Sequence, residues 1–147
     1  MIPLEWNEAL VTGVDEMDQQ HRLLMDMVLQ ARAGLNGRPA TTLFEQLTRD
    51  LLAYAIYHFA TEERLMRQYD FAAAYPEEAR RHVEEHRGFS ARVVSLRVQG
   101  RSGSPQSSSD LVGFLEGWLM NHIMVVDPPL ARHIRSREPR ELREPRR

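Results

Sequence analysis

The sequence contains no cysteine and no lysine. Without cysteine, disulfide bonds and thiolate metal ligands are excluded, so any bound metal ion must be held by nitrogen and oxygen atoms. All 19 basic residues are arginines, and the 21 acidic residues bring the net charge to −2. The chemistry of the chain must therefore rest on histidine, carboxylate and arginine side chains.

Long apolar runs are also missing. No stretch is long enough to span a bilayer, and Met1–Trp6 lacks the basic region followed by an apolar stretch that marks a secretory signal. These absences predict a cytoplasmic protein that does not have a membrane as its partner. At 147 residues, 42% of them hydrophobic and 27% charged, the chain has the size and composition of one globular domain.

Arginine is concentrated at the C-terminal end. Residues 135–147 hold six arginines and three glutamates, a net charge of +3, which leaves −5 on residues 1–134. The acidic remainder argues against nucleic acid as the main partner. We predict that residues 1–134 form the folded domain and that residues 135–147 form a flexible tail. The alternative is that the tail binds a protein partner.

Apolar residues recur at spacings of three and four in four segments, which predicts four amphipathic helices. They follow an irregular N-terminal arm over residues 1–15. Asn36-Gly37 is a helix stop signal, and Pro76 is suited to the first turn of a helix. The predicted helices cover residues 15–35, 42–69, 76–100 and 110–127.

Two of these boundaries depend on short polar motifs. Thr42 and Glu45 have the spacing of a capping box at the start of the second helix. Residues 100–109 are rich in serine and glycine and predict a flexible loop, with Ser109 or Asp110 as the cap of the fourth helix. Four helices with mostly short connections predict an all-α fold, an antiparallel up-down-up-down four-helix bundle.

Histidines and a carboxylate interrupt the apolar stripes at positions that face the bundle interior. The third helix carries His82 and His86 at i, i+4 spacing, so both imidazoles can reach one metal ion. A single histidine there would ordinarily be a hydrogen-bonded core residue. Burying five imidazoles and a carboxylate without partners, however, would cost several kcal/mol in total, so the set predicts a metal site. Its members are His21, His58, Glu62, His82, His86 and His122.

Asp127 is the seventh predicted ligand. It lies five residues beyond His122, and a continuing α-helix would turn its side chain about 140° away from the inner face. A residue before proline is disfavoured in the helical region. Pro128 therefore predicts that the helix ends at Asp127 and that the carboxylate turns back toward His122. The alternative is that Asp127 caps a short last helix that begins at Pro128.

Counting ligands favours two metal ions. Five imidazoles, two carboxylates that each bridge both ions and one shared solvent oxygen fill eleven of the twelve positions around two octahedral ions. Imidazole and carboxylate ligands suit iron, manganese or zinc. The one open position is a place where a small molecule can bind.

These residues resemble the hemerythrin family, specifically its single-domain bacterial members, the bacteriohemerythrins. The resemblance implies a four-helix bundle that binds dioxygen reversibly and is not an enzyme. It also implies, as the cofactor, two iron ions joined by an oxo or hydroxo bridge. The match runs from Trp6 to Asp127 and is carried by Gln20-His21, His58-Phe59-Ala60-Thr61-Glu62-Glu63, His82-x-x-x-His86 and His122-x-x-x-x-Asp127.

The resemblance also assigns roles to individual residues. It implies that one iron is bound by His82, His86 and His122. It implies that the second iron, which keeps the vacancy, is bound by His21 and His58, with Glu62 and Asp127 as bridges. It further implies an apolar dioxygen pocket that limits access of water. The pocket would be lined by Trp6, Leu24, Phe59, Trp118, Leu119 and Ile123.

Some residues fall outside this pattern. His133 has no counterpart among the ligands and is predicted to lie on the surface. Glu63, Glu84 and Glu85 lie beside ligands in the sequence but are predicted to point into solvent.

Other functions stay open at this stage. One is a di-iron oxidase, peroxidase or nitric-oxide-handling enzyme, although the inner positions lack the Glu-x-x-His motif of oxidative di-iron bundles. Another is a sensor of oxygen or iron that acts through a partner bound to the arginine-rich tail. A purely structural bundle would leave the buried histidines unexplained. The oligomeric state is not predicted.

Overall fold

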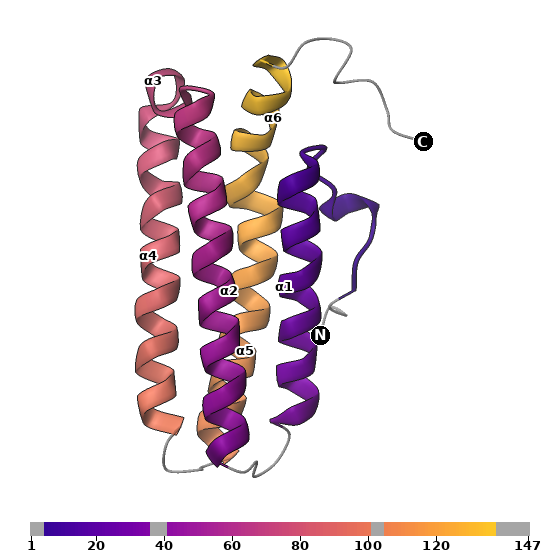
Figure 1. The fold of residues 1–147 in the computed structure, drawn as a ribbon, viewed down its shortest axis with the longest axis vertical. Helices are drawn as coiled ribbons and strands as arrows, with labels where there is room; N and C mark the ends of the chain where they lie inside the picture. Colours follow the sequence, from indigo (N-terminus) through magenta and orange to yellow (C-terminus); the bar gives the residue numbers. More distant parts are fainter. Residues whose placement is uncertain (1–4, 36–40, 101–104, 138–147) are drawn as a thin grey trace.

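A computed structural model describes residues 5–35, 41–100 and 105–137 of the chain. In these ranges every regular element is a helix. Four rods lie side by side: α1, α2, α4 and a continuous rod made of α5, η3 and α6 (Figure 1). The elements are η1 (Glu8–Leu10), α1 (Asp15–Gly34), α2 (Thr41–Gln68), α3 (Phe71–Ala74), α4 (Pro76–Gln99), α5 (Pro105–Asn121), the π-helical turn η3 (His122–Val126) and α6 (Asp127–Arg137).

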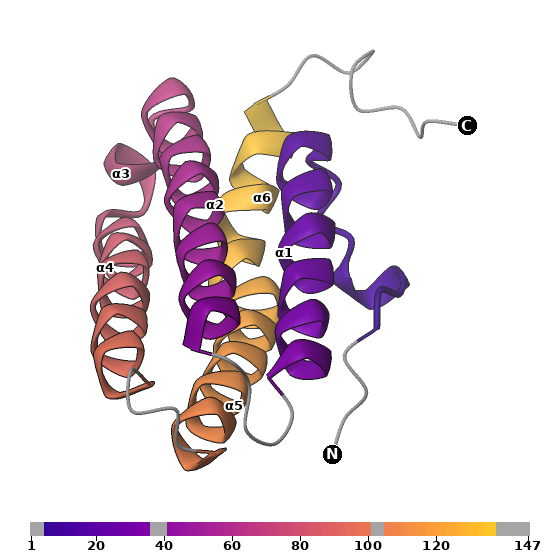
Figure 2. The ribbon, with the colours of Figure 1, turned by 60° about the horizontal axis from the view of Figure 1, so that its bottom comes forward.

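The rods form a closed ring in which each alternates in direction with its neighbour. α1 contacts α2, α2 contacts α4, α4 contacts α5, and α5 contacts α1. Figures 1 and 2 show α2 and α4 meeting at the end that carries α3. This arrangement confirms the predicted antiparallel four-helix bundle. None of the described helices combines the length and apolar character needed to cross a bilayer.

The apolar core is split into two clusters along the bundle. One cluster includes Leu24, Phe59 and Leu119, and the other includes Met17 and Leu130. On each rod the predicted metal ligands lie at the boundary between the two clusters. A polar layer is therefore enclosed between two apolar layers.

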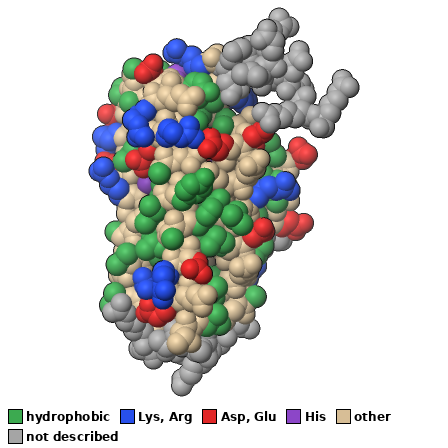
Figure 3. Space-filling model, in the orientation of Figure 1, with side chains coloured by type: hydrophobic (Ala, Val, Ile, Leu, Met, Phe, Trp, Pro, Cys, Tyr) green, Lys and Arg blue, Asp and Glu red, His purple; other side chains and the backbone are tan. Residues whose placement is uncertain are grey.

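Charged side chains cover much of the outside. On the face shown in Figure 3, arginines and carboxylates are interspersed, and apolar side chains gather around the middle. Arg64 of α2 lies 2.7 Å from Glu16 of α1, and Arg80 lies 2.6 Å from Glu84 within α4. Such exposed pairs each contribute about 0–1 kcal/mol, so the bundle depends mainly on its buried layers.

Two predicted helix starts are wrong. α5 begins at Pro105 and not after Ser109, because proline is well suited to a first helical turn. Of the predicted loop over residues 100–109, residues 101–104 lie outside the described residues. α2 begins at Thr41, so Thr42 is already helical and is not the residue that caps the helix; the Glu45 carboxylate accepts hydrogen bonds from Arg97 at 2.7 and 3.0 Å. The Asn36-Gly37 stop signal lies outside the described residues.

The predicted end of the fourth helix at Asp127 is also wrong. Asp127 has helical backbone angles, φ −75° and ψ −32°, although it precedes Pro128. The preceding turn is π-helical, and the Asp127 N–H donates to the His122 carbonyl five residues back. A π-turn brings residues five apart into register, so the Asp127 carboxylate faces the interior without leaving the helix. α6 begins at Asp127 itself.

His133 is buried, contrary to the prediction of a surface residue. It is 6% exposed, and its Nε2 lies 2.6 Å from the Tyr69 carbonyl at the end of α2. Its ring lies beside those of Phe71 and Tyr75. This contact joins α6 to the turn around Asp70, whose backbone is left-handed at φ 54°. The short helix α3 that follows this turn was not predicted.

The N-terminal arm is tied to both ends of the chain's helical part. The Asp18 carboxylate accepts hydrogen bonds from the Thr12 N–H and hydroxyl, both at 2.8 Å, and from the Gly13 N–H at 3.2 Å. Arg135 donates to the Thr12 carbonyl at 3.0 Å. Residues 135–137 therefore belong to α6, and the flexible tail stays a prediction because residues 138–147 lie outside the described part.

Replacing Gly13 by alanine is expected to destabilise the fold. Gly13 has φ +89°, and an added Cβ would lie 2.8 Å from Arg135 Cδ. The left-handed backbone alone costs about 1–2 kcal/mol for a residue with a Cβ, and displacing Arg135 would also break its bond to Thr12. Urea unfolding of Gly13→Ala measures the loss. Gly113→Ala is the control, because an added Cβ at that helical position meets no other atom. Alanine there should raise the free energy of unfolding by about 0.5–1 kcal/mol. Equal stability of the two variants would contradict the expectation.

Candidate metal centre

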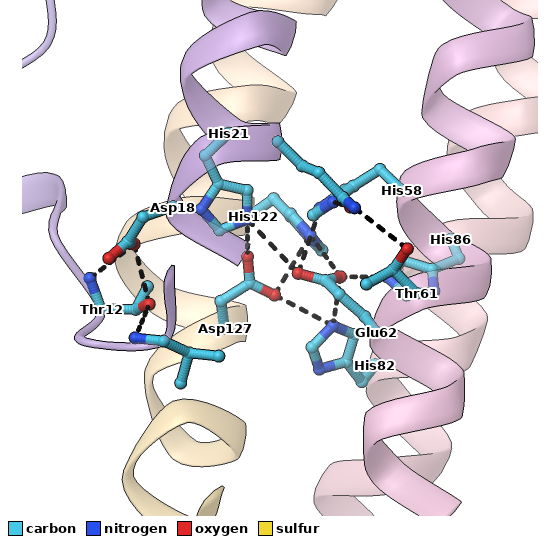
Figure 4. Close-up of polar contacts among 12 residues, drawn as sticks. Thr12, Asp18, His21, His58, Thr61, Glu62, His82, His86, His122 and Asp127 are labelled. Carbon is cyan, nitrogen blue, oxygen red and sulfur yellow. Dashed lines mark hydrogen bonds and ion pairs between the residues drawn. The ribbon is translucent and has the colours of Figure 1, made fainter. Parts of the chain in front are cut away.

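The seven predicted ligands meet in the polar layer (Figure 4). Each side chain is at most 2% exposed. α1 contributes one of them, α2 and α4 contribute two each, and the last two are the first residue of the π-turn η3 and the first residue of α6. Their i, i+4 spacing on α2 and α4 and i, i+5 spacing across η3 aim both members of each pair inward. The residues are His21, His58, Glu62, His82, His86, His122 and Asp127.

Glu62 lies at the centre of this layer and divides the histidines into two groups. Its Oε1 faces three imidazole Nε2 atoms, and its Oε2 faces the other two. The distances are 3.1, 2.9 and 3.0 Å from Oε1 to His82, His86 and His122, and 3.3 and 3.1 Å from Oε2 to His21 and His58. One carboxylate thus spans a three-histidine group and a two-histidine group.

Asp127 repeats the same division. Its Oδ1 lies 3.0 Å from His82 Nε2 and 3.1 Å from His122 Nε2, both in the three-histidine group. Its Oδ2 lies 2.6 Å from His21 Nε2, in the two-histidine group. Both carboxylates therefore place one oxygen toward each group.

These separations fit ligands that share metal ions. Two ligand atoms at right angles, each about 2.1 Å from one ion, are about 3.0 Å apart. The nitrogens and oxygens here approach to that distance, and His58 Nε2 has no hydrogen-bond partner among the described residues. The Nε2 atoms of five imidazoles and the oxygens of two carboxylates thus converge on one small buried volume. The donor set is therefore suited to metal.

The carboxylates and imidazoles of this layer shift one another's pKa values. Burial lowers the pKa of His21 and His82, but the carboxylates of Asp127 and Glu62 outweigh burial and raise each pKa to about 10. Burial raises the pKa of Glu62, but the neighbouring histidines, first His58 and then His122, hold it well below its usual value. Without metal, protons on His21 and His82 balance the two carboxylates. A metal ion must displace those protons.

A hydrogen-bonded chain from α1 and α2 orients His58. Gln20 Oε1 accepts a 2.7 Å hydrogen bond from His58 Nδ1, and Gln20 Nε2 donates to the Thr61 hydroxyl at 3.1 Å. Thr61 in turn donates to the Tyr57 carbonyl. A partner on Nδ1 fixes the ring so that Nε2 faces the metal. The sequence motif included Gln20 and Thr61 but assigned them no role, although each is a polar residue next to a ligand or one turn from it.

Glu63 plays the corresponding part for His86. Its Oε2 lies 2.9 Å from His86 Nδ1, and its side chain is 33% exposed. The prediction that Glu63 points away from the core is therefore wrong. Glu84 is exposed as predicted and pairs with Arg80, whereas Glu85 is only partly exposed.

Aromatic rings cover the three-histidine group. Phe59 stacks on His86 with ring centroids 4.1 Å apart, and Trp118 stacks on His122 at 4.5 Å. The other predicted pocket residues belong to the apolar layer on the same side as Phe59, in which Leu24, Leu119 and Ile123 are buried and Trp6 is partly buried. Their role as a dioxygen pocket stays a prediction.

Comparisons with known proteins agree with this geometry. The sequence model of the family described as "Hemerythrin HHE cation binding domain" matches residues 12–128. A bacteriohemerythrin of Pseudomonas aeruginosa (strain LESB58) is 32% identical over 125 residues, which cover 84% of this chain and 76% of that protein.

Two further relatives match at similar levels. A bacteriohemerythrin of Stenotrophomonas maltophilia (strain R551-3) is 30% identical over 138 residues, 92% of this chain and 84% of the relative. A myohemerythrin of Riftia pachyptila is 30% identical over 125 residues, 85% of this chain and 88% of the relative. With the family match extending over most of the chain and both predicted bridging carboxylates in place, this protein belongs to the hemerythrin family.

Proposed function

We propose that the polar layer holds two iron ions and that this centre binds dioxygen reversibly, for storage, carriage or delivery. Membership of the hemerythrin family makes the chain an oxygen-binding protein with a non-haem iron site. The number of ions rests on one observation: Glu62 and Asp127 each direct one oxygen to the three-histidine group and one to the two-histidine group. A single ion could not use both groups in this way.

The two groups would differ in how many positions they leave for a ligand. Three imidazoles and two bridging oxygens would come from the protein on one side, but only two imidazoles and two bridging oxygens on the other. The ion held by His21 and His58 would therefore keep the open position. When bound there, ferrous iron supplies both the site and the electrons for reversible dioxygen binding.

The surrounding residues support this function by position and by exclusion of water. Gln20 and Glu63 hold the rings of His58 and His86 in place through their Nδ1 atoms. The apolar layers on either side of the site shield it, because a dry surrounding limits side reactions with water. The Glu63 side chain is an exception because it is partly exposed to solvent, and it contacts His86 of the three-histidine group.

Spectroscopy of the iron-loaded protein tests the proposal. We expect two irons per chain by elemental analysis. Air added to the anaerobically reduced protein should produce visible charge-transfer absorption that disappears when oxygen is removed, over repeated cycles. Irreversible oxidation in the first cycle would contradict reversible binding, and one iron per chain would contradict a shared centre. The cytoplasmic location and a protein partner for the tail stay predictions.

A further inference from the structure

One aromatic side chain connects a ligand of the centre to the protein surface. The Trp118 indole lies nearly parallel to the His122 imidazole, with an interplanar angle of 14° and centroids 4.5 Å apart. Trp118 is also partly exposed. Phe59 is stacked on His86 in a similar way but is buried. Of these two stacked rings, only that of Trp118 reaches solvent.

The outer side of Trp118 opens into a surface pocket between α4 and α5. The pocket has a volume of about 430 Å³. Gly88 contributes to its wall, and an added Cβ there would meet no atom within 4 Å. The pocket is lined by Arg81, Glu84, Glu85, Gly88, Phe114 and Trp118. A small soluble molecule can therefore approach the indole without a change in the fold.

The inner side of Trp118 is held in a packed aromatic cluster. Its ring lies 4.4 Å from Phe89 and 5.5 Å from Phe59, centroid to centroid. These contacts fix the indole against His122, whose Nε2 faces Oε1 of Glu62 at 3.0 Å. One rigid chain of π systems thus extends from the pocket to the three-histidine group.

We propose that Trp118 relays electrons between a reductant in this pocket and the metal centre, by way of the His122 imidazole. The inference rests on the proposed di-iron function. Oxygen carriage requires ferrous iron, and an oxidised centre needs two electrons to return to that state. A soluble one-electron reductant would deliver them in two successive steps, each oxidising one reductant molecule and reducing one ferric ion to ferrous. The indole forms and breaks no bond.

This assignment separates two tasks within the centre. The open position for dioxygen would belong to the two-histidine group, which is enclosed. The electrons would reach the three-histidine group, on which both Trp118 and the partly exposed Glu63 converge. A reductant could then restore the ferrous state without occupying the dioxygen position.

Anaerobic stopped-flow reduction of the oxidised, iron-loaded protein by hexaammineruthenium(II) tests the relay. Trp118→Leu removes the stacked ring and is expected to slow reduction by about tenfold. Trp118→Tyr keeps an aromatic ring in place and should slow it less. Iron content and the visible spectrum are recorded for each variant, so that rates are compared between intact centres.

A second pair of variants leaves Trp118 and all ligands unchanged. Gly88→Leu places a side chain in the pocket and should also slow reduction, whereas Gly113→Leu makes the same change at an open helical position outside the pocket and should not. Rates within twofold of wild type for both Trp118→Leu and Gly88→Leu would overturn the relay. If dioxygen binding is reversible in the same preparations, that result leaves the proposed function standing.

Discussion

Glu62→Gln is expected to empty the metal centre. Glutamine has nearly the same volume as glutamate but carries no charge, and its amide nitrogen would face one of the two histidine groups with hydrogens in place of a lone pair. Because Glu62 is within 3.3 Å of all five histidines, one substitution weakens both halves. Iron affinity should fall by more than about 100-fold, beyond the roughly 10- to 100-fold typical of residues outside the coordination sphere.

The adjacent carboxylate supplies a matched control. Glu63 contacts only the Nδ1 side of His86, and a glutamine there can still accept that hydrogen bond through its amide oxygen. Glu63→Gln should therefore retain iron, with at most roughly a tenfold loss of affinity. Elemental analysis after iron loading and desalting gives the comparison, and circular dichroism confirms that both variants are helical. Normal iron content in Glu62→Gln would rule out a bridging role.

Metal-free protein is expected to lose stability as the pH rises above neutrality. The pKa of His21 and of His82 is about 10 in the fold, above the ordinary value of 6.5, because the carboxylates outweigh burial. A raised pKa stabilises the fold fully below about pH 6.5, and this contribution disappears as the pH approaches 10. The loss should be on the order of a few kcal/mol.

The absence of lysine and cysteine makes this effect measurable, because few other groups titrate in the same range. Urea unfolding at about pH 6.5, 8 and 9.5 would show it. In the iron-loaded protein the histidines are deprotonated by the metal, so its stability should vary much less over this range. Stability of the metal-free protein that stays constant or increases toward pH 9.5 would contradict the expected protonation of His21 and His82.

Acid should also destabilise the metal-free protein, for the opposite reason. The neighbouring histidines lower the pKa of Glu62 despite its burial. A lowered carboxyl pKa stabilises the fold above the ordinary value near 4.5 and ceases to do so as the pH falls below the folded pKa. Together with the loss at alkaline pH, this places the maximum stability of the metal-free protein near neutrality.

The sequence predicts the ligand layer well because helical periodicity determines which side chains face inward. His58 and Glu62, or His82 and His86, need only an intact α-helix to share a face. The same reasoning could not place Glu63. It lies off the inner stripe of α2, and its contact with His86 depends on the distance between two packed helices.

The errors at helix ends have a different origin. The local propensity of Asp127 before Pro128 favours a break, but the packing of buried Leu130 and Ile134 keeps the chain helical. His133 lacked a metal role in the sequence pattern and was assigned to the surface, although the Tyr69 carbonyl offers it a buried acceptor. Tertiary contacts determine both the helical backbone at Asp127 and the burial of His133. Such contacts between distant segments cannot be read from a single sequence.

The π-helical turn η3 contains one residue more than an α-helical turn, and this determines how α6 is rotated about its own axis. It turns the Asp127 carboxylate inward, and the same rotation brings His133 beneath Tyr69 and directs Arg135 to the Thr12 carbonyl. Lengthening that turn by one residue would turn the Asp127 carboxylate away from His21 and would also break the contacts of His133 with Tyr69 and of Arg135 with Thr12. The number of residues between His122 and Asp127 therefore also determines whether α6 can contact the N-terminal arm and the end of α2.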